Sequence, residues 1–72
     1  MSDLGKIFGE RVKELREDKG ISIRMLAKEI NIAHSAIARW ENGTKLPSVE
    51  SVVIVADYFG VTTDYLLGLE DY

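Results

Sequence analysis

The side chains that could bind another molecule by charge are mostly basic, and they are concentrated between residues 11 and 45. This segment has eight lysines and arginines against five acidic residues, which gives a local net charge of +3. From residue 46 onward every charged residue is acidic, and the net charge of the whole chain is −3. Counterion release from phosphates depends on the local field, so the basic segment is compatible with nucleic-acid binding. A solvated mixture of surface charges is the alternative interpretation.

The other residue types offer little for catalysis or metal binding. One histidine and no cysteine leave no metal-spaced cluster, and there is no glycine-rich phosphate loop. We interpret Gly5 and Gly9 as flanking the start of a helix. The lack of cysteine also excludes disulfides and fits a reducing compartment. We therefore expect no enzyme activity, no metal site, no cofactor and no evident small-molecule ligand.

Length and hydropathy limit the class of protein. With 72 residues, the sequence predicts one domain over residues 1–72, with a core that contributes only about 3–5 kcal/mol. Domains this small are often stabilised further by oligomerisation. There is no signal-peptide pattern and no apolar run long enough to span a membrane. We expect a soluble cytoplasmic protein without a membrane partner.

The elements that would position the basic segment are two short helices joined by a tight turn. Ala27 is small where the helices would cross, Asn31 tolerates a left-handed turn, and Ile37 would lock the second helix onto the first. This pattern predicts a helix-turn-helix unit over about residues 22–42. The second helix of such a unit fits the major groove of DNA.

Periodicity and capping residues predict five helices in an all-α domain. The first helix ends at Lys19 before Gly20, and Ser22 is the N-cap of the second. The third extends from about His34 to Trp40.

The last two helices depend on an apolar stripe and on a cap. Pro47 and Ser48 open the fourth helix, and Thr62 caps a short fifth helix over Asp64–Leu67. Residues 51–55 are rich in β-branched side chains and would favour a strand in isolation. Helical spacing of the apolar residues nevertheless predicts a helix, with a core stripe made of Val49, Val52, Val53, Ala56 and Phe59.

Together these motifs resemble the Cro/repressor-type helix-turn-helix family of bacterial and phage transcription regulators. The matching motifs are GERVKELREDKGIS, the Ala27/Asn31/Ile37 unit, WENG followed by Pro47, and VADYFGVTTDYLLG. The match covers residues 9–68 in one register without insertions. It implies a compact five-helix, lambda-repressor-like fold that binds specific double-stranded DNA sequences, with repression favoured over activation and neither marked by a residue of the sequence. Such a protein would be associated with the nucleoid.

The resemblance also implies which residues read bases. Arginine can read guanine through paired hydrogen bonds to O6 and N7, and an alanine can meet a thymine methyl group. The alternative for His34 is a merely exposed residue, and for Arg39 a surface charge or a partner of Glu41. The implied base-reading positions are Ala33, His34, Ser35, Ala38 and Arg39.

The phosphate anchors implied by the family are less complete in this chain. Ile23 stands where many members have glutamine, and Ala33 where they often have a serine or threonine N-cap. The loop after Gly43 is also less basic than usual. We therefore expect modest affinity per monomer. The implied phosphate-contacting residues are Ser22, Asn42, Thr44 and Lys45.

Two residues near the end of the third helix are interpreted as structural. Trp40 is expected to pack between helices with only an edge exposed. Glu41 matches a family position that pairs with an arginine of the first helix, which we assign to Arg11. A partly buried pair of this kind fixes the tilt between helices. Contact of Arg11 with phosphate is the alternative.

Apolar residues outside the predicted core indicate a homodimer. Ile54 and Tyr58 lie one turn apart off the core stripe, and Tyr65, Leu69 and Tyr72 add apolar surface near the C-terminus. A two-fold dimer through the last two helices would separate the recognition helices by ~34 Å, matching a palindromic operator. Scattered surface hydrophobes are the alternative.

A second functional class remains open, namely a protein-interaction module on the same fold, such as an antitoxin or anti-repressor. Ile23 and the alanines of the third helix favour it, whereas Arg39, Lys45 and the charge distribution favour DNA binding. The chain could also be the N-terminal domain of a longer regulator.

Overall fold

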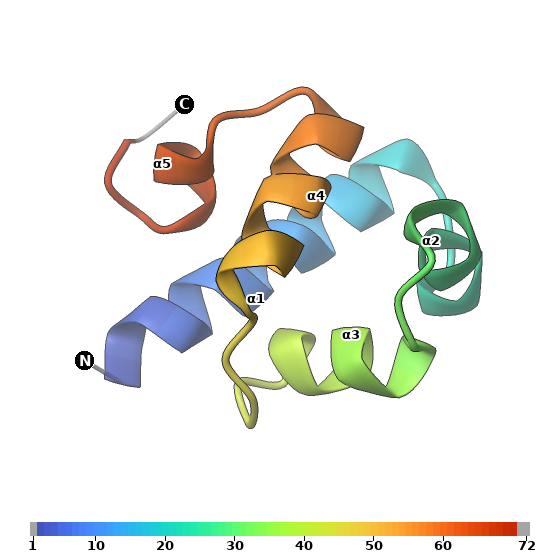
Figure 1. Ribbon diagram of the computed structural model, residues 1–72, viewed down its shortest axis with the longest axis horizontal. Helices are drawn as coiled ribbons and strands as arrows, with labels where there is room; N and C mark the ends of the chain where they lie inside the picture. Colours follow the sequence, from blue (N-terminus) through green and yellow to red (C-terminus); the bar gives the residue numbers. More distant parts are fainter. Residues whose placement is uncertain (1, 71–72) are drawn as a thin grey trace.

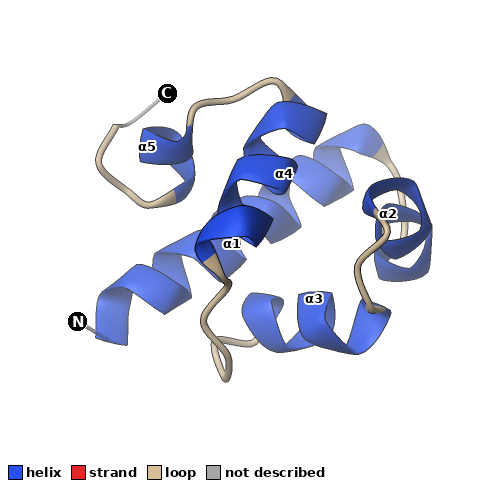
Figure 2. Ribbon diagram, in the orientation of Figure 1, coloured by secondary structure: helices blue, strands red, loops and turns tan. Residues whose placement is uncertain are grey.

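The computed structural model describes residues 2–70 as five helices, with no strand in that range (Figures 1 and 2). The predicted all-α, five-helix architecture is therefore confirmed, and the β-branched segment 51–55 is helical. The helices are α1 (Ser2–Lys19), α2 (Ile23–Ile30), α3 (His34–Glu41), α4 (Val49–Phe59) and α5 (Thr63–Leu66).

Three of the helices begin at hydroxyl caps. The side-chain oxygens of these caps accept hydrogen bonds from the backbone N–H three residues ahead, at 2.9–3.0 Å. Each cap satisfies a donor that a helix start otherwise leaves unpaired. The capping residues are Ser22 for α2, Ser48 for α4 and Thr62 for α5.

The turn between α2 and α3 has the predicted left-handed residue. Asn31 has φ 58° and ψ 45°, and it is the one non-glycine residue with positive φ in the described range 2–70. The amide of Ile32 donates to the carbonyl oxygen of Ala27 at 3.1 Å, which closes the end of α2. Asparagine tolerates this region better than most residues, so the turn forms without glycine.

All five helices contribute side chains to the core. Trp40 is only 2% exposed, and its ring meets that of Phe8 edge to face with centroids 5.4 Å apart. This confirms the expected packing of Trp40. The buried set is Phe8, Val12, Leu26, Ile37, Trp40, Val52, Val55, Ala56 and Leu66.

Two glycines lie inside α1, which corrects their interpretation as flanking a helix start. A Cβ atom at Gly9 would lie 1.8 Å from the backbone oxygen of Trp40. At Gly5 it would lie 2.6 Å from the Cδ2 atom of Leu46. Glycine is unfavourable in a helix, but at Gly9 it lets the backbones of α1 and α3 approach closely.

The buried face of α4 is rotated from the predicted stripe. Val49 is 83% exposed and Val53 is 54% exposed, whereas Val55 is fully buried beside Ala56. Val49 is the first residue of α4, and the first buried residue of this helix is Val52. Val53 is turned about 100° from the buried Val52. The prediction that Val49 and Val53 belong to the core was therefore wrong.

Candidate nucleic-acid interface

The outer face of α3 is available to a ligand because the helix packs through Ile37 and Trp40. In Figure 1, α3 lies along the lower edge of the molecule, with α2 beside it. Arg39 makes no side-chain hydrogen bond or ion pair with residues 2–70. Of the predicted base-reading residues, Ala38 is half-buried, and the exposed ones are Ala33, His34, Ser35 and Arg39.

The N-terminal end of α3 lacks a side-chain cap. Ala33 occupies the N-cap position with φ −55° and ψ 134°, and no side chain hydrogen-bonds to the start of the helix. The first backbone N–H groups of α3 can therefore be bonded by water or by an acceptor from another molecule.

The loop after α3 is shaped by its own polar side chains. The Oδ1 atom of Asn42 accepts from the Thr44 hydroxyl at 2.6 Å and from the Thr44 amide at 3.1 Å. The Asn42 amide NH₂ group remains as a donor, and Lys45 is exposed. At the start of α2, Ser22 accepts the capping bond and keeps its own proton for donation.

The inner side of α3 is held by an ion pair with α1, but the arginine is not the predicted one. Arg16 donates from Nε to Glu41 Oε2 at 2.8 Å and from Nη2 to Glu41 Oε1 at 2.9 Å. Its Nη1 also donates to the carbonyl oxygen of Ile21 at 2.9 Å. The side chains of Arg16 and Glu41 are only 12% and 7% exposed. Donating these hydrogen bonds to the Glu41 carboxylate raises the pKa of Arg16 above its usual value.

The assignment of this pair to Arg11 was therefore wrong. Arg16 lies five positions after Arg11 on α1, so the two side chains project about 140° apart around the helix axis. Arg11 instead faces the C-terminal turn, where its Nη1 donates to the carbonyl oxygens of Tyr65 and Glu70, both at 2.8 Å. Its guanidinium also lies 4.3 Å from the centre of the Tyr65 ring.

The residues expected at a dimer interface are partly engaged within the chain. The Tyr58 hydroxyl donates to Glu29 at 3.3 Å, and the Lys19 ammonium lies 5.2 Å from the ring centre. Partial burial and the Glu29 carboxylate raise the pKa of Tyr58. Ile54, Tyr58 and Tyr65 are half-buried, whereas Leu69 is 70% exposed. Tyr72 lies outside the described residues, and the interface stays a prediction.

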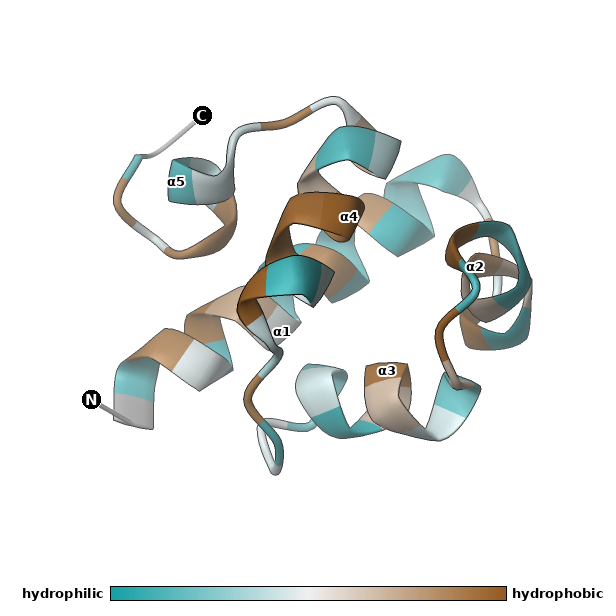
Figure 3. Cartoon of the chain, viewed as in Figure 1, coloured by the Kyte–Doolittle hydropathy of each residue, from teal (hydrophilic) through white to brown (hydrophobic). Residues whose placement is uncertain are grey.

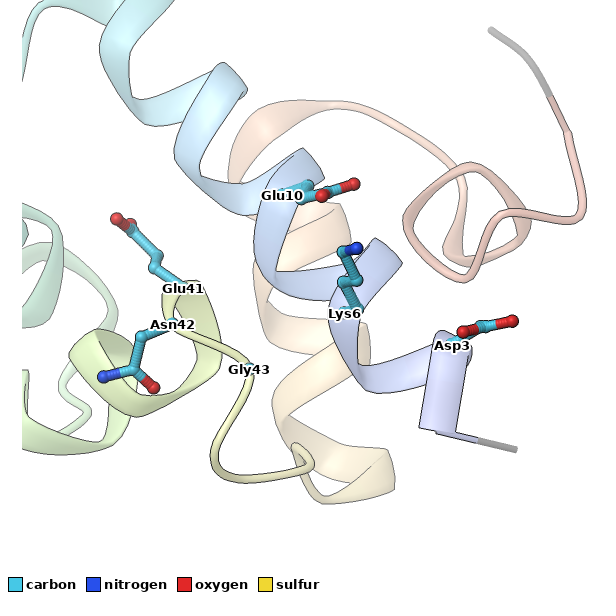
Figure 4. A pocket seen from close by; sticks show the side chains of 6 residues that line it. All are labelled: Asp3, Lys6, Glu10, Glu41, Asn42 and Gly43. Atoms are coloured by element: carbon cyan, nitrogen blue, oxygen red, sulfur yellow. The ribbon is translucent and has the colours of Figure 1, made fainter.

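A hollow of about 360 Å³ lies between the start of α1 and the end of α3. In Figure 4 the side chains of Glu41 and Asn42 point away from those of Lys6 and Glu10. The hollow therefore lacks converging groups, and we assign it no ligand. Within residues 2–70, no three histidine or acidic side chains gather as a metal site. No helix in that range has the length and apolar character needed to cross a membrane.

Comparison with known proteins agrees with this geometry. Residues 12–66 match a protein family described as helix-turn-helix. The transcriptional regulator AnsR of Bacillus subtilis is 41% identical over 85% of this chain and 53% of its own length. Another regulator of that organism, YobD, is 34% identical over 90% of this chain and 58% of its length. The transcriptional activator BcrR of Enterococcus faecalis is 34% identical over 89% of this chain.

The chain spans 58% or less of each of these three relatives. For BcrR the matched part is 31% of the protein. The similarity therefore concerns one domain of longer proteins.

Proposed function

The chain belongs to the Cro/repressor-type helix-turn-helix family, and we propose that it binds specific double-stranded DNA sequences as a transcriptional regulator. The observation that carries this proposal is the outer face of α3. It presents Arg39, Ser35 and His34 to solvent while the inner face is fixed in the core. A DNA-binding role would place the protein with the nucleoid.

The proposed base reader is Arg39, with α3 lying in the major groove. Its guanidinium forms no hydrogen bond or ion pair with residues 2–70. It can therefore form paired hydrogen bonds to O6 and N7 of a guanine. Arg39 pairing with Glu41 is disfavoured because the Glu41 carboxylate binds Arg16. The small side chains Ala33 and Ala38 would let the helix approach thymine methyl groups.

The proposed phosphate anchors lie at both ends of the helix-turn-helix unit. Ser22 can donate its hydroxyl proton and Asn42 its amide NH₂, while Lys45 supplies a positive charge. Thr44 donates its hydroxyl to Asn42 in this conformation, so we assign it to shaping the loop. With Ile23 in place of a polar residue, these few contacts support modest affinity per copy.

We further propose a two-fold dimer on a palindromic operator, acting as a repressor by occupying the site. A domain of 28 × 24 × 20 Å on each half-site would compete with any other protein for the same stretch of DNA. BcrR is named an activator, but the matched part is only 31% of that protein. Its name therefore does not indicate whether this chain activates or represses transcription. We propose no catalytic role.

The alternative is a protein-interaction module on the same fold. It is supported by the apolar residues that remain exposed, including Leu46 at 63% and Val49 at 83%. In that case, selection from random duplex DNA at stated salt would enrich no sequence. The DNA-binding proposal expects one enriched palindrome.

A pair of variants tests the assigned roles on the enriched sequence. Arg39→Ala should cost ~1–3 kcal/mol on the specific site and relax the preference at one base pair. Lys45→Ala should weaken specific and random DNA alike and reduce the salt slope by about one unit. If Arg39→Ala weakens both DNAs equally, Arg39 is not a base reader.

A further inference from the structure

Two basic side chains of α2 have no partner within the described part of the chain. Arg24 and Lys28 are exposed, and neither makes a side-chain hydrogen bond or an ion pair with residues 2–70. They lie one turn apart, so their Cβ atoms are neighbours at about 5–6 Å on the helix surface. In Figure 3 the ribbon of α2 has hydrophilic segments beside apolar ones. We call these two residues the α2 basic pair.

The direction of the α2 basic pair follows from helix geometry. At about 100° per residue, Arg24 and Lys28 each project about 160° away from Leu26, which is fully buried. Glu29, whose carboxylate accepts a hydrogen bond from Tyr58 of α4, lies about 140° from Arg24 and about 100° from Lys28. The pair therefore projects into solvent, away from the core and from α4.

Arg24 borders the proposed DNA surface. Ser22, a proposed phosphate anchor, is the N-cap of α2, and Arg24 follows in the first turn of the same helix. Ala27, the small residue expected where α2 crosses α3, is half-buried and lies only about 60° from Arg24 around the helix axis. Ile23 packs against the core, so Arg24 is the first polar side chain within α2. The pair thus extends the surface of α3 onto α2.

We propose that the α2 basic pair binds phosphates of duplex DNA beside the groove that α3 enters. This inference rests on the proposed function, to which it adds two charged contacts. Among the phosphate anchors already proposed, Ser22 and Asn42 are neutral donors and Lys45 is a cation. A guanidinium binds phosphate through paired hydrogen bonds, and an ammonium binds it as a point charge. With the pair, three cations instead of one would face the DNA backbone.

The charge pattern of α2 favours an anionic partner for this pair. Like charges one turn apart on a helix repel each other and destabilise it. The positions three and four residues before and after Arg24 and Lys28 hold no acidic residue that could offset this repulsion. Glu29 directly follows Lys28, but adjacent residues do not face each other on a helix. A phosphate group between the two cations would relieve the repulsion.

The salt dependence of DNA affinity tests the proposal. Arg24→Gln and Lys28→Gln should each reduce the slope of log K against log salt concentration by about 0.9, on specific and random duplexes alike. At about 0.1 M salt, that slope corresponds to a loss of affinity of up to about eightfold for each variant. Arg24→Lys keeps the charge and should keep the slope.

Lys19→Gln is the matched control, because it removes the same charge at another exposed position. The Lys19 ammonium lies 5.2 Å from the ring centre of Tyr58, on the α4 side of the molecule. We expect this variant to keep the slope of the wild type. Because Arg24 and Lys28 are exposed and repel each other, their glutamine variants should melt at the wild-type temperature or slightly above it. A loss of DNA affinity would then not come from unfolding.

Lysine acetylation gives a readout on the unchanged protein. A random-sequence duplex at low salt should protect Lys28 from an acetylating reagent and leave Lys19 as reactive as in the free protein, as measured by mass spectrometry. Equal reactivity of Lys28 with and without the duplex would contradict the proposal.

The two proposals can fail separately. If the wild type selects a sequence through Arg39 while Arg24→Gln and Lys28→Gln keep the same salt slope as Lys19→Gln, the α2 basic pair binds no phosphate and the proposed function stands. If the wild type binds no duplex DNA at low salt, both proposals are overturned.

Discussion

The C-terminal end of α3 is packed and ion-paired against α1, whereas its N-terminal end has no side-chain cap. At the C-terminal end, Glu41 is fixed by Arg16, Trp40 is buried against Phe8, and the backbone touches α1 at Gly9. At the N-terminal end, Ala33 supplies no cap. A helix that enters the major groove needs a fixed direction, which one firmly held end provides. Unpaired N–H groups at the other end remain available to an acceptor from water or another molecule.

The strongest test of the fixed end is Gly9→Ala. The added Cβ would meet the backbone oxygen of Trp40 at 1.8 Å, and a backbone atom cannot swing aside. We expect a loss of about 3 kcal/mol in the free energy of unfolding, from overpacking at the α1–α3 crossing. Thermal unfolding should show this as a large drop in Tm.

Gly5→Ala is the matched control on the same helix. Its added Cβ would meet only the end of the exposed Leu46 side chain, which can rotate away. Because alanine is favoured over glycine in helices by up to about 1 kcal/mol, stability should be unchanged or higher. Equal losses in both variants would show that α3 is not fixed specifically at Gly9.

Breaking the ion pair should have a smaller effect. Glu41→Gln removes the charge opposite Arg16 in a pair whose side chains are 12% and 7% exposed. We expect a loss of about 2–3 kcal/mol, below the 3–5 kcal/mol of complete burial, measured by chemical denaturation. Glu14→Gln, at an exposed position of α1, is the control and should be near neutral.

A double-mutant cycle checks the partner. Coupling should be found between Glu41→Gln and Arg16→Gln, because these side chains share two hydrogen bonds. Arg11→Gln should instead be additive with Glu41→Gln. Coupling to Arg11 in place of Arg16 would refute the observed pairing.

The smallest expected effect is at the uncapped end. The backbone of Ala33, at φ −55° and ψ 134°, lies near the extended conformation of the Ser48 cap, at φ −74° and ψ 162°. Ala33→Ser should therefore add a cap and raise stability by about 1 kcal/mol. Ser48→Ala should cost a similar amount in the same melting assay. An unchanged Tm for Ala33→Ser would mean that the two ends of α3 differ less than described.

Local features of the fold were predictable from the sequence. The caps Ser22 and Thr62 act on residues three positions ahead, and the left-handed Asn31 lies in its own turn. Such signals need no knowledge of distant neighbours. Even the β-branched segment 51–55 was assigned correctly, because the apolar spacing outweighed local propensity.

Features that depend on which helix lies opposite were not predictable. Arg11 and Arg16 both lie on α1, and only the packed structure shows that α3 faces Arg16 and the C-terminal turn faces Arg11. Likewise, the sequence alone does not show that Val55 is buried while Val49 is exposed, because burial depends on which face of α4 packs against the other helices. The roles of the base-reading and phosphate residues stay predictions until DNA is tested.

The contacts of Arg11 set an order of events during synthesis. Its two carbonyl partners come 54 and 59 residues later in the chain, at Tyr65 and Glu70. A ribosome makes α1 first, so Arg11 leaves the exit tunnel long before either carbonyl exists. The apolar face of α1 can already pack on α3 through Phe8 and Trp40, but the Arg11 guanidinium lacks these two carbonyl partners until residues 65–70 have emerged. The contact between α1 and the C-terminal turn is therefore the last of these contacts to form.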